Sequence, residues 1–192
     1  MDRKLSKKRD DSYFAAGRRK RNKNMIMVMA IVIPVIAIGV VVALLFKPAP
    51  VQAIDGIECE PAEVLNYHVH AHLDVFIDGS PHQVPASIGI LSSPACFYWL
   101  HTHTTDGIIH IESPSEKTFT LGQFIDVWNQ TRHDSTLSNE LATKSVSVYV
   151  NGTKASGDYR DVQLQSREEV ALVIGNAPST IPSAYPSNGP PR

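Results

Sequence analysis

The sequence predicts an α+β domain, with a mainly antiparallel sheet and one packed amphipathic helix, that follows a single transmembrane helix. Three observations carry this prediction. Met25–Phe46 contains no charged residue, Tyr67–Asp78 alternates between apolar and polar residues, and apolar residues at helical spacing begin at Leu121. Two hairpins, one helix and further strands, in that order, are typical of α+β folds. This order is compatible with a β-grasp-like arrangement.

Met25–Phe46 is a run of twenty-two uncharged residues. At about 1.5 Å per residue, it is long enough to cross a hydrocarbon core of about 30 Å. Residues 1–24 hold ten Lys or Arg and three Asp, so the positive-inside rule keeps this basic arm in the cytoplasm and places the following domain outside the cell membrane. Anionic membrane lipids are the expected partners of the span and the arm.

A cleavable signal peptide is the alternative, because Val51-Gln52-Ala53 resembles a cleavage site with small residues. The apolar region of a signal peptide runs about 7–15 residues, however, and this run is longer. We therefore favour an uncleaved signal anchor.

Composition divides the rest of the chain into a linker, a domain and a tail. Residues 47–56 are a predicted linker, stiffened by Pro48 and Pro50. The extracytoplasmic domain is expected over residues 57–175, and residues 176–192, with five prolines, are a predicted disordered tail. Residues 47–192 hold eight Lys or Arg and sixteen Asp or Glu, and this acidic balance argues against a nucleic-acid partner.

Tyr67–Asp78 is expected to be the first long strand. Its odd-numbered residues are apolar or aromatic, whereas His68, His70 and His72 are even-numbered, so the strand is half-buried and carries its histidines on the polar face. Residues i and i+4 of a strand lie about 13–14 Å apart. One metal ion is therefore expected to take neighbouring histidines of this strand rather than all three.

Asp78-Gly79 is expected to close a hairpin into residues 82–85. This hairpin would place His82 on the core face, so we leave His82 out of the predicted site. Pro81 and Pro85 predict an edge strand, because proline cannot donate to a strand ladder. Residues 86–93 are expected to be a connection.

Asp106-Gly107 is a strong signal for a two-residue hairpin turn, since both residues suit a positive φ. With these two residues as the loop, His103 would face His110 and His101 would face Glu112. Alternation along each strand would put these four side chains on one side, with opposed Cβ atoms about 4.5–5.5 Å apart. Three imidazoles and a carboxylate at that spacing can bind one metal ion. The alternative is the solvent-exposed face of an ordinary hairpin.

The expected cofactor is a divalent metal ion, because imidazole and carboxylate ligands suit zinc, copper(II) or iron(II). All four methionines lie in residues 1–29, so the domain offers no thioether ligand. The predicted ligands are His101, His103, His110 and Glu112 of the hairpin, with His68, His70 or His72 added from the neighbouring strand.

A helix is predicted to start at Thr120, because Thr120 and Gln123 fit a capping box. Apolar residues at helical spacing follow, and the helix should end within residues 129–133. His133 would lie at the helix end, and we give it no part in the site. Further strands are expected over residues 145–150, 160–165 and 170–174.

Cys59 and Cys96 are the two cysteines of the chain. Both follow the span, in a compartment where oxidation is permitted, so we predict a disulfide between them. In the alternative interpretation, Cys96 is a thiolate ligand beside two histidines, as in a blue-copper centre.

Three segments together carry a family resemblance: Y-H-V-H-A-H-L-D-V-F-I-D-G, C-F-Y-W-L-H-T-H-T-T-D-G-I-I-H-I-E-S-P and F-T-L-G-Q-F-I-D-V-W. They resemble a family of exported, singly membrane-anchored microbial domains of unassigned activity, and the likeness covers about residues 59–175. The H-x-H pair with a later histidine is also weakly similar to cupins. Asp106 stands where a cupin would have glutamate, and the glycine framing of cupins is absent.

Three functions fit these observations. The leading hypothesis is a membrane-anchored extracytoplasmic metal-binding domain, for metal handling or delivery. The second is an accessory structural subunit that docks into a larger membrane complex through its span. The third is a metalloenzyme with a His/carboxylate site. The sequence contains no P-loop, no G-x-S-x-G elbow and no C-x-x-C, so nucleotide, serine-hydrolase and thioredoxin-like functions lack support.

Overall fold

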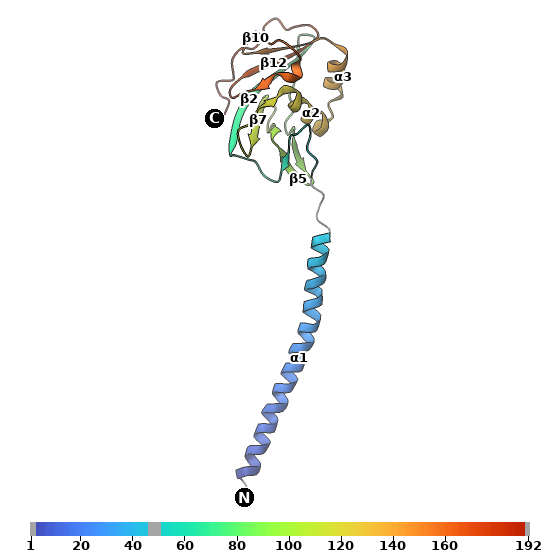
Figure 1. The fold of residues 1–192 in the computed structure, drawn as a ribbon, viewed down its shortest axis with the longest axis vertical. Coiled ribbons are helices and arrows are strands. Elements are labelled where there is room, and N and C mark those ends of the chain that lie inside the picture. Colours follow the sequence, from blue (N-terminus) through green and yellow to red (C-terminus); the bar gives the residue numbers. More distant parts are fainter. Residues whose placement is uncertain (1–2, 46–50, 191–192) are drawn as a thin grey trace. The chain divides into compact units, whose positions relative to one another are not determined.

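Helix α1 (Arg3–Leu45) forms one of two compact units of the chain, and the domain after it forms the other. The computed structural model describes residues 3–45 and 51–190 (Figure 1). Within α1, the segment Lys23–Val42 is apolar and long enough to cross a membrane. Residues 3–24 of the predicted basic arm and residues 25–45 of the predicted span therefore belong to one continuous helix. Residues 1–2 and Phe46 lie outside the described residues. Which side of a membrane each end occupies stays a prediction.

The centre of the domain is a seven-stranded sheet in which one pair of neighbours is parallel and the others are antiparallel. The parallel pair joins β2 and β12, with His72 opposite Glu169. The α+β prediction is confirmed, whereas a β-grasp-like arrangement stays a prediction. The strands across the sheet are β10 (Thr153–Lys154), β9 (Val146–Val150), β12 (Glu169–Ile174), β2 (Tyr67–Ile77), β7 (Ile108–Ser113) and β6 (Leu100–His101), and β3 (Ser80–His82) pairs with the last residues of β2.

Helix α2 (Leu121–Arg132) begins and ends as the sequence predicts. The Thr120 hydroxyl oxygen accepts a hydrogen bond from the Gln123 backbone N–H, and the Gln123 side-chain oxygen accepts one from the Thr120 N–H. This capping box satisfies two backbone donors at the start of the helix. His133 follows the helix with a φ of 53°.

One face of β2 belongs to the main core. Its odd-numbered residues Ala71, Leu73 and Val75 are buried in the same cluster as Phe124 and Trp128 of α2. Alternation along the strand then turns the even-numbered histidines toward the opposite face of the sheet. The predicted half-buried strand is therefore confirmed.

The opposite face of the sheet carries a smaller apolar cluster that the C-terminal segment helps to cover. Phe76, Ala171 and Val173 form this cluster, and Ile181 packs against it. Beyond Ile181, the Arg167 guanidinium lies 5.2 Å from the centre of the Tyr185 ring. The described part of the tail, residues 176–190, contains no helix or strand, and Ile181 and Tyr185 contact the domain. That the tail from residue 176 is disordered stays a prediction.

Two small sheets complete the strands of the domain. One contains β1 (Cys59–Glu60), β5 (Ala95–Tyr98) and β4 (Ile90–Ser92), and the other pairs β8 (Phe119–Thr120) with β11 (Gln163–Leu164), after a 3₁₀ turn over Tyr159–Asp161. The predicted disulfide is confirmed: Cys59 and Cys96 are bonded, with their Cα atoms 5.6 Å apart. The interpretation of Cys96 as a thiolate ligand is therefore wrong.

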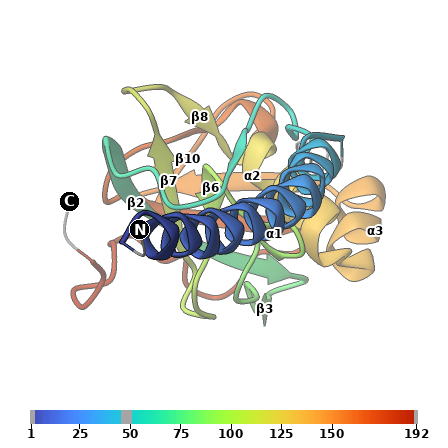
Figure 2. The same ribbon diagram turned by 90° about the horizontal axis from the view of Figure 1, so that it is seen from below.

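The structure also contains elements that the sequence analysis did not assign. Strand β4 lies inside residues 86–93, which the sequence predicts as a connection, and α3 (Ser135–Thr143) follows α2 directly. Helix α3 was not predicted because Leu137 is its one buried residue, so its sequence shows no apolar stripe at helical spacing. Its start is capped by the Asp134 side chain, which accepts a hydrogen bond from the Leu137 N–H. The two helices lie side by side next to the strands (Figures 1 and 2), and Ser138 of α3 donates a hydrogen bond to Asn129 of α2.

The described part of the predicted linker, residues 51–56, also joins the domain. Ile54 is buried in the main core and pairs with Ile57 through backbone hydrogen bonds of 3.0 and 2.8 Å. Gln52 accepts a hydrogen bond from the Tyr98 hydroxyl. Residues 47–50 lie outside the described residues.

Candidate metal centre

Three histidines form a row across β2, β7 and β6. His70 lies opposite His110, and His110 lies opposite His101. The sequence predicts another register, with His103 opposite His110 and His101 opposite Glu112, and that prediction is wrong by two residues. A shift of two residues preserves alternation, so His101, His110 and Glu112 still share one face.

The register differs because β6 ends at His101 and residues 102–107 form a longer loop than the predicted two-residue turn. Thr102 is the cause. Its hydroxyl donates a hydrogen bond to the Pro85 carbonyl and accepts one from the Ile88 N–H, and its own N–H donates to the Ile88 carbonyl. These contacts draw the chain away from β7 immediately after His101.

His103 lies in this loop and still reaches the row of histidines. The centres of the His103 and His110 rings are 4.4 Å apart, and those of His101 and His110 are 5.1 Å apart. On the other side of His110, the His68 and His70 ring centres lie at 5.4 and 4.6 Å. These five residues are the histidine cluster, in which four imidazoles surround that of His110.

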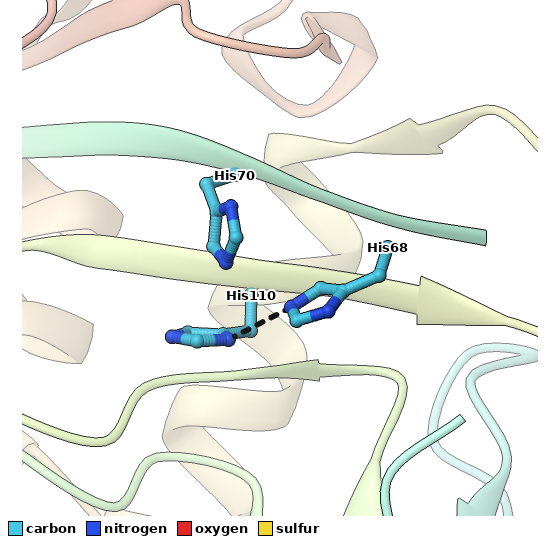
Figure 3. Close-up of side chains that lie close together, drawn as sticks. All are labelled: His68, His70 and His110. Carbon is cyan, nitrogen blue, oxygen red and sulfur yellow. Dashed lines mark hydrogen bonds between the residues drawn. The ribbon is translucent and has the colours of Figure 1, made fainter. Parts of the chain in front are cut away.

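Within the histidine cluster, two sets of three residues can each offer ligand atoms within 4.8 Å of one another. The first triad is His68, His70 and His110, and the second is His101, His103 and His110. Figure 3 shows the first triad: His68 and His70 extend from β2 toward His110 on β7, and Nε2 of His68 lies 3.2 Å from Nδ1 of His110. His110 therefore belongs to both triads.

The backbone sets the tautomer of His101. Its Nδ1 lies 2.9 Å from the carbonyl oxygen of Tyr98, and a carbonyl can only accept, so Nδ1 carries the proton. The neutral ring then presents the lone pair of Nε2, 3.2 Å from Nε2 of His103. Metal-binding histidines are commonly oriented in this way by a backbone carbonyl.

Three imidazoles of the histidine cluster are held in the neutral form that metal ligation requires. Burial, followed by the neighbouring histidines, lowers the pKa of His110 to about 3. Burial likewise lowers the pKa of His101 to about 4, against the opposing effect of its bond to Tyr98. Burial also lowers the pKa of His68. At neutral pH these three imidazoles offer lone pairs rather than positive charge.

Glu112 is buried beside the cluster. Its Oε2 accepts a hydrogen bond of 2.7 Å from the Val64 N–H, whereas Oε1 lies 3.4 Å from Nε2 of His68 and 3.9 Å from Nε2 of His101. Oε1 makes no hydrogen bond within the described part of the chain. Burial raises the pKa of Glu112 to about 7, opposed by the Val64 N–H and reinforced by the charge of Glu63.

Glu63 is a candidate ligand that the sequence analysis missed. Its Oε1 lies 3.0 Å from Nε2 of His103, and Glu63, His101 and Glu112 form a third set of convergent groups. Glu63 lies in an irregular segment between β1 and β2. No periodic pattern of residues marked it, because only the tertiary fold brings that segment over the strands.

His72, predicted with the other ligands, belongs to a different set. Its Nδ1 lies 2.7 Å from Oε2 of Glu169, and its Nε2 donates a 2.9 Å hydrogen bond to the Asp106 carbonyl. His72, Asp74 and Glu169 can offer ligand atoms within 4.8 Å of one another, and we call them the His72 group. Burial works to lower the pKa of His72, but the bond to Glu169 and the nearby carboxylates raise it overall, while burial raises the pKa of Glu169.

The two histidines that the sequence analysis left out belong to neither set. His82 stacks against Trp128 with ring centres 6.2 Å apart, and its Nε2 lies 2.9 Å from Asp134. His133 is exposed at the end of α2.

Comparison with known proteins found no matching family model, no matching curated protein and no matching solved structure. The case for a function therefore depends on the geometry of these side chains.

Proposed function

We propose that this protein is a membrane-anchored, extracytoplasmic metal-binding protein whose histidine cluster binds a divalent transition-metal ion. The observation that carries the proposal is the convergence of the two triads on His110, with ligand atoms within 4.8 Å in each. Bonds of about 2.0–2.1 Å from zinc to imidazole nitrogen place two ligands of one ion within about 4.2 Å of each other. Small side-chain rotations are sufficient to meet that requirement.

The ligand types narrow the choice of ion. The cluster offers imidazoles, with the carboxylates of Glu63 and Glu112 beside them. Both cysteines are in the disulfide, so thiolate is not available. Imidazole with carboxylate suits zinc, copper(II) and iron(II).

Accessibility supports a role in metal handling or delivery. His101 is fully buried, whereas the side chain of His103 is 36% exposed and lies in the 102–107 loop. An ion can therefore be held by buried ligands and still exchange through an exposed one.

The apolar helix α1 and the disulfide support export and anchoring. Lys23–Val42 meets the length and hydropathy needed for a membrane span, and disulfides persist mainly in oxidising compartments outside the cytoplasm. The basic residues before the span favour a cytoplasmic N-terminus.

The metal content of the full chain, purified in detergent micelles, tests the proposal. We compare the native protein with a double variant, His68→Ala with His103→Ala, that breaks both triads and leaves His110 in place. His82→Ala with His133→Ala is the matched control. We expect stoichiometric zinc, copper or iron in the native protein and the control, and a loss of that metal in the double variant. Equal metal content in all three proteins, or none in the native protein, would overturn the proposal.

A further inference from the structure

The sheet face that carries the histidine cluster holds another set of convergent polar groups, formed by β2 and the start of β12. His72 and Glu169 are partners in the parallel register of these strands. Asp74, two residues further along β2, projects to the same side as His72, and its Oδ2 lies 3.9 Å from Nδ1 of His72. One imidazole and two carboxylates therefore meet over the parallel pair.

The 102–107 loop sets the orientation of His72. A carbonyl only accepts, so the bond from Nε2 of His72 to the Asp106 carbonyl requires the proton on Nε2. Nδ1 then faces both carboxylates, 2.7 Å from Oε2 of Glu169 and 3.9 Å from Oδ2 of Asp74. Gly107 permits this contact, because a Cβ at that position would lie 2.9 Å from Nε2 of His72 and 2.5 Å from the Leu73 carbonyl oxygen.

Glu169 gives an independent indication of a ligand. The residue is only 1% exposed to solvent, and its Oε1 makes no hydrogen bond within the described residues. A buried carboxylate oxygen without a donor is costly, and a bound cation would remove that cost. A divalent cation bound between the two carboxylates would balance their charge and would replace the proton between Nδ1 of His72 and Glu169, which is released to solvent.

The site also has an approach from solvent. Between the 102–107 loop, which precedes β7, and the end of β3, a cavity of about 280 Å³ is lined by residues that include Asp74, Thr105 and Asp106. Asp74 thus belongs to the His72 group and also faces a space large enough to admit a hydrated ion.

From these contacts we propose that His72, Asp74 and Glu169 form a second divalent-cation site, separate from the histidine cluster. Two of its three ligands are carboxylates, whereas the histidine cluster offers mainly imidazoles. Carboxylate oxygens are the harder ligands in the sense of hard and soft acids and bases. The second site should therefore accept Mn²⁺ more readily than the imidazole-rich cluster does.

Titration of the full chain in detergent micelles with Mn²⁺ tests this proposal, with the signal of free Mn²⁺ followed by electron paramagnetic resonance. We compare the native protein with Glu169→Gln and Asp74→Asn. Glu168→Gln is the matched control, since it changes the neighbouring glutamate. The double variant His68→Ala with His103→Ala reports on the histidine cluster.

We expect one saturable Mn²⁺ site in the native protein, the Glu168 control and the cluster variant. The Mn²⁺ affinity should fall at least about 100-fold in Glu169→Gln and Asp74→Asn. Changing a residue that only orients a metal ligand costs up to about 100-fold, and loss of a ligand itself should cost at least as much. If Glu169→Gln fails to fold, the partly exposed Asp74 provides the test through Asp74→Asn alone. Native-like Mn²⁺ affinity in Asp74→Asn, or no saturable Mn²⁺ binding in the native protein, would overturn the second site. Loss of Mn²⁺ binding in the cluster variant would also overturn it. Metal content of the histidine cluster decides the first proposal separately.

Discussion

The substitution His110→Ala should weaken metal binding more than the loss of any other histidine in the cluster. His110 contributes to both triads, whereas His68 contributes to one and His103 to the other. After His68→Ala or His103→Ala, one complete triad remains. After His110→Ala, neither does.

The expected size of the effect follows from the number of ligands. Structural zinc sites with four ligands bind with about 10–16 kcal/mol, so one ligand accounts for on the order of 3 kcal/mol. That loss corresponds to an increase in Kd of more than about 100-fold. For His68→Ala or His103→Ala we expect about 10-fold or less, because the ion can occupy the remaining triad.

Isothermal titration calorimetry of zinc into the full chain in detergent micelles, with a competing chelator, measures these differences. His133→Ala is the matched control, since His133 is exposed at the end of α2. Circular dichroism checks that each variant is folded. Equal affinities for His110→Ala and His133→Ala would refute the assignment of His110. Losses in His68→Ala and His103→Ala as large as that in His110→Ala would refute the arrangement of two alternative triads.

Three further predictions concern pH, the disulfide and topology. In the metal-free protein, the pKa of His101 is about 4 when folded and about 6.5 when unfolded. The unfolded chain therefore binds this proton first, and the free energy of unfolding should fall by about 3 kcal/mol as pH drops from above 6.5 to below 4. Denaturant titrations across this range should give a smaller pH dependence for His101→Gln, and an unchanged one would contradict the buried neutral His101. Replacing Cys59 and Cys96 together by serine should lower the free energy of unfolding by roughly 3–4 kcal/mol on the chain-entropy estimate for a loop of this size, measured by the same titration. No change would show that the bond does not constrain the unfolded chain. Protease added to intact cells should cleave the domain, and protection of the domain until lysis would reverse the proposed topology.

Local patterns in the sequence were sufficient for several features of the domain. Alternation in Tyr67–Ile77 predicts which side chains are buried, because successive residues of any strand point to opposite faces. The capping box at Thr120 predicts the start of α2, because its donors and acceptors lie within one helical turn. The disulfide followed from the presence of two cysteines in a segment that the sequence predicts to be exported.

Which histidines share an ion was decided by tertiary contacts. The register between β6 and β7 depends on Thr102, whose hydrogen bonds reach Pro85 and Ile88. Those partners lie outside the hairpin, so the Asp106-Gly107 signal alone predicts a turn that the fold does not make. Similarly, His72 lies outside the histidine cluster and contacts Glu169, which is 97 residues further along the chain. The two residues are adjacent only because β12 pairs with β2. Alternation within a strand is a local property and can be predicted from the sequence. The pairing between strands depends on contacts from the whole domain, and it determines the membership of both candidate sites.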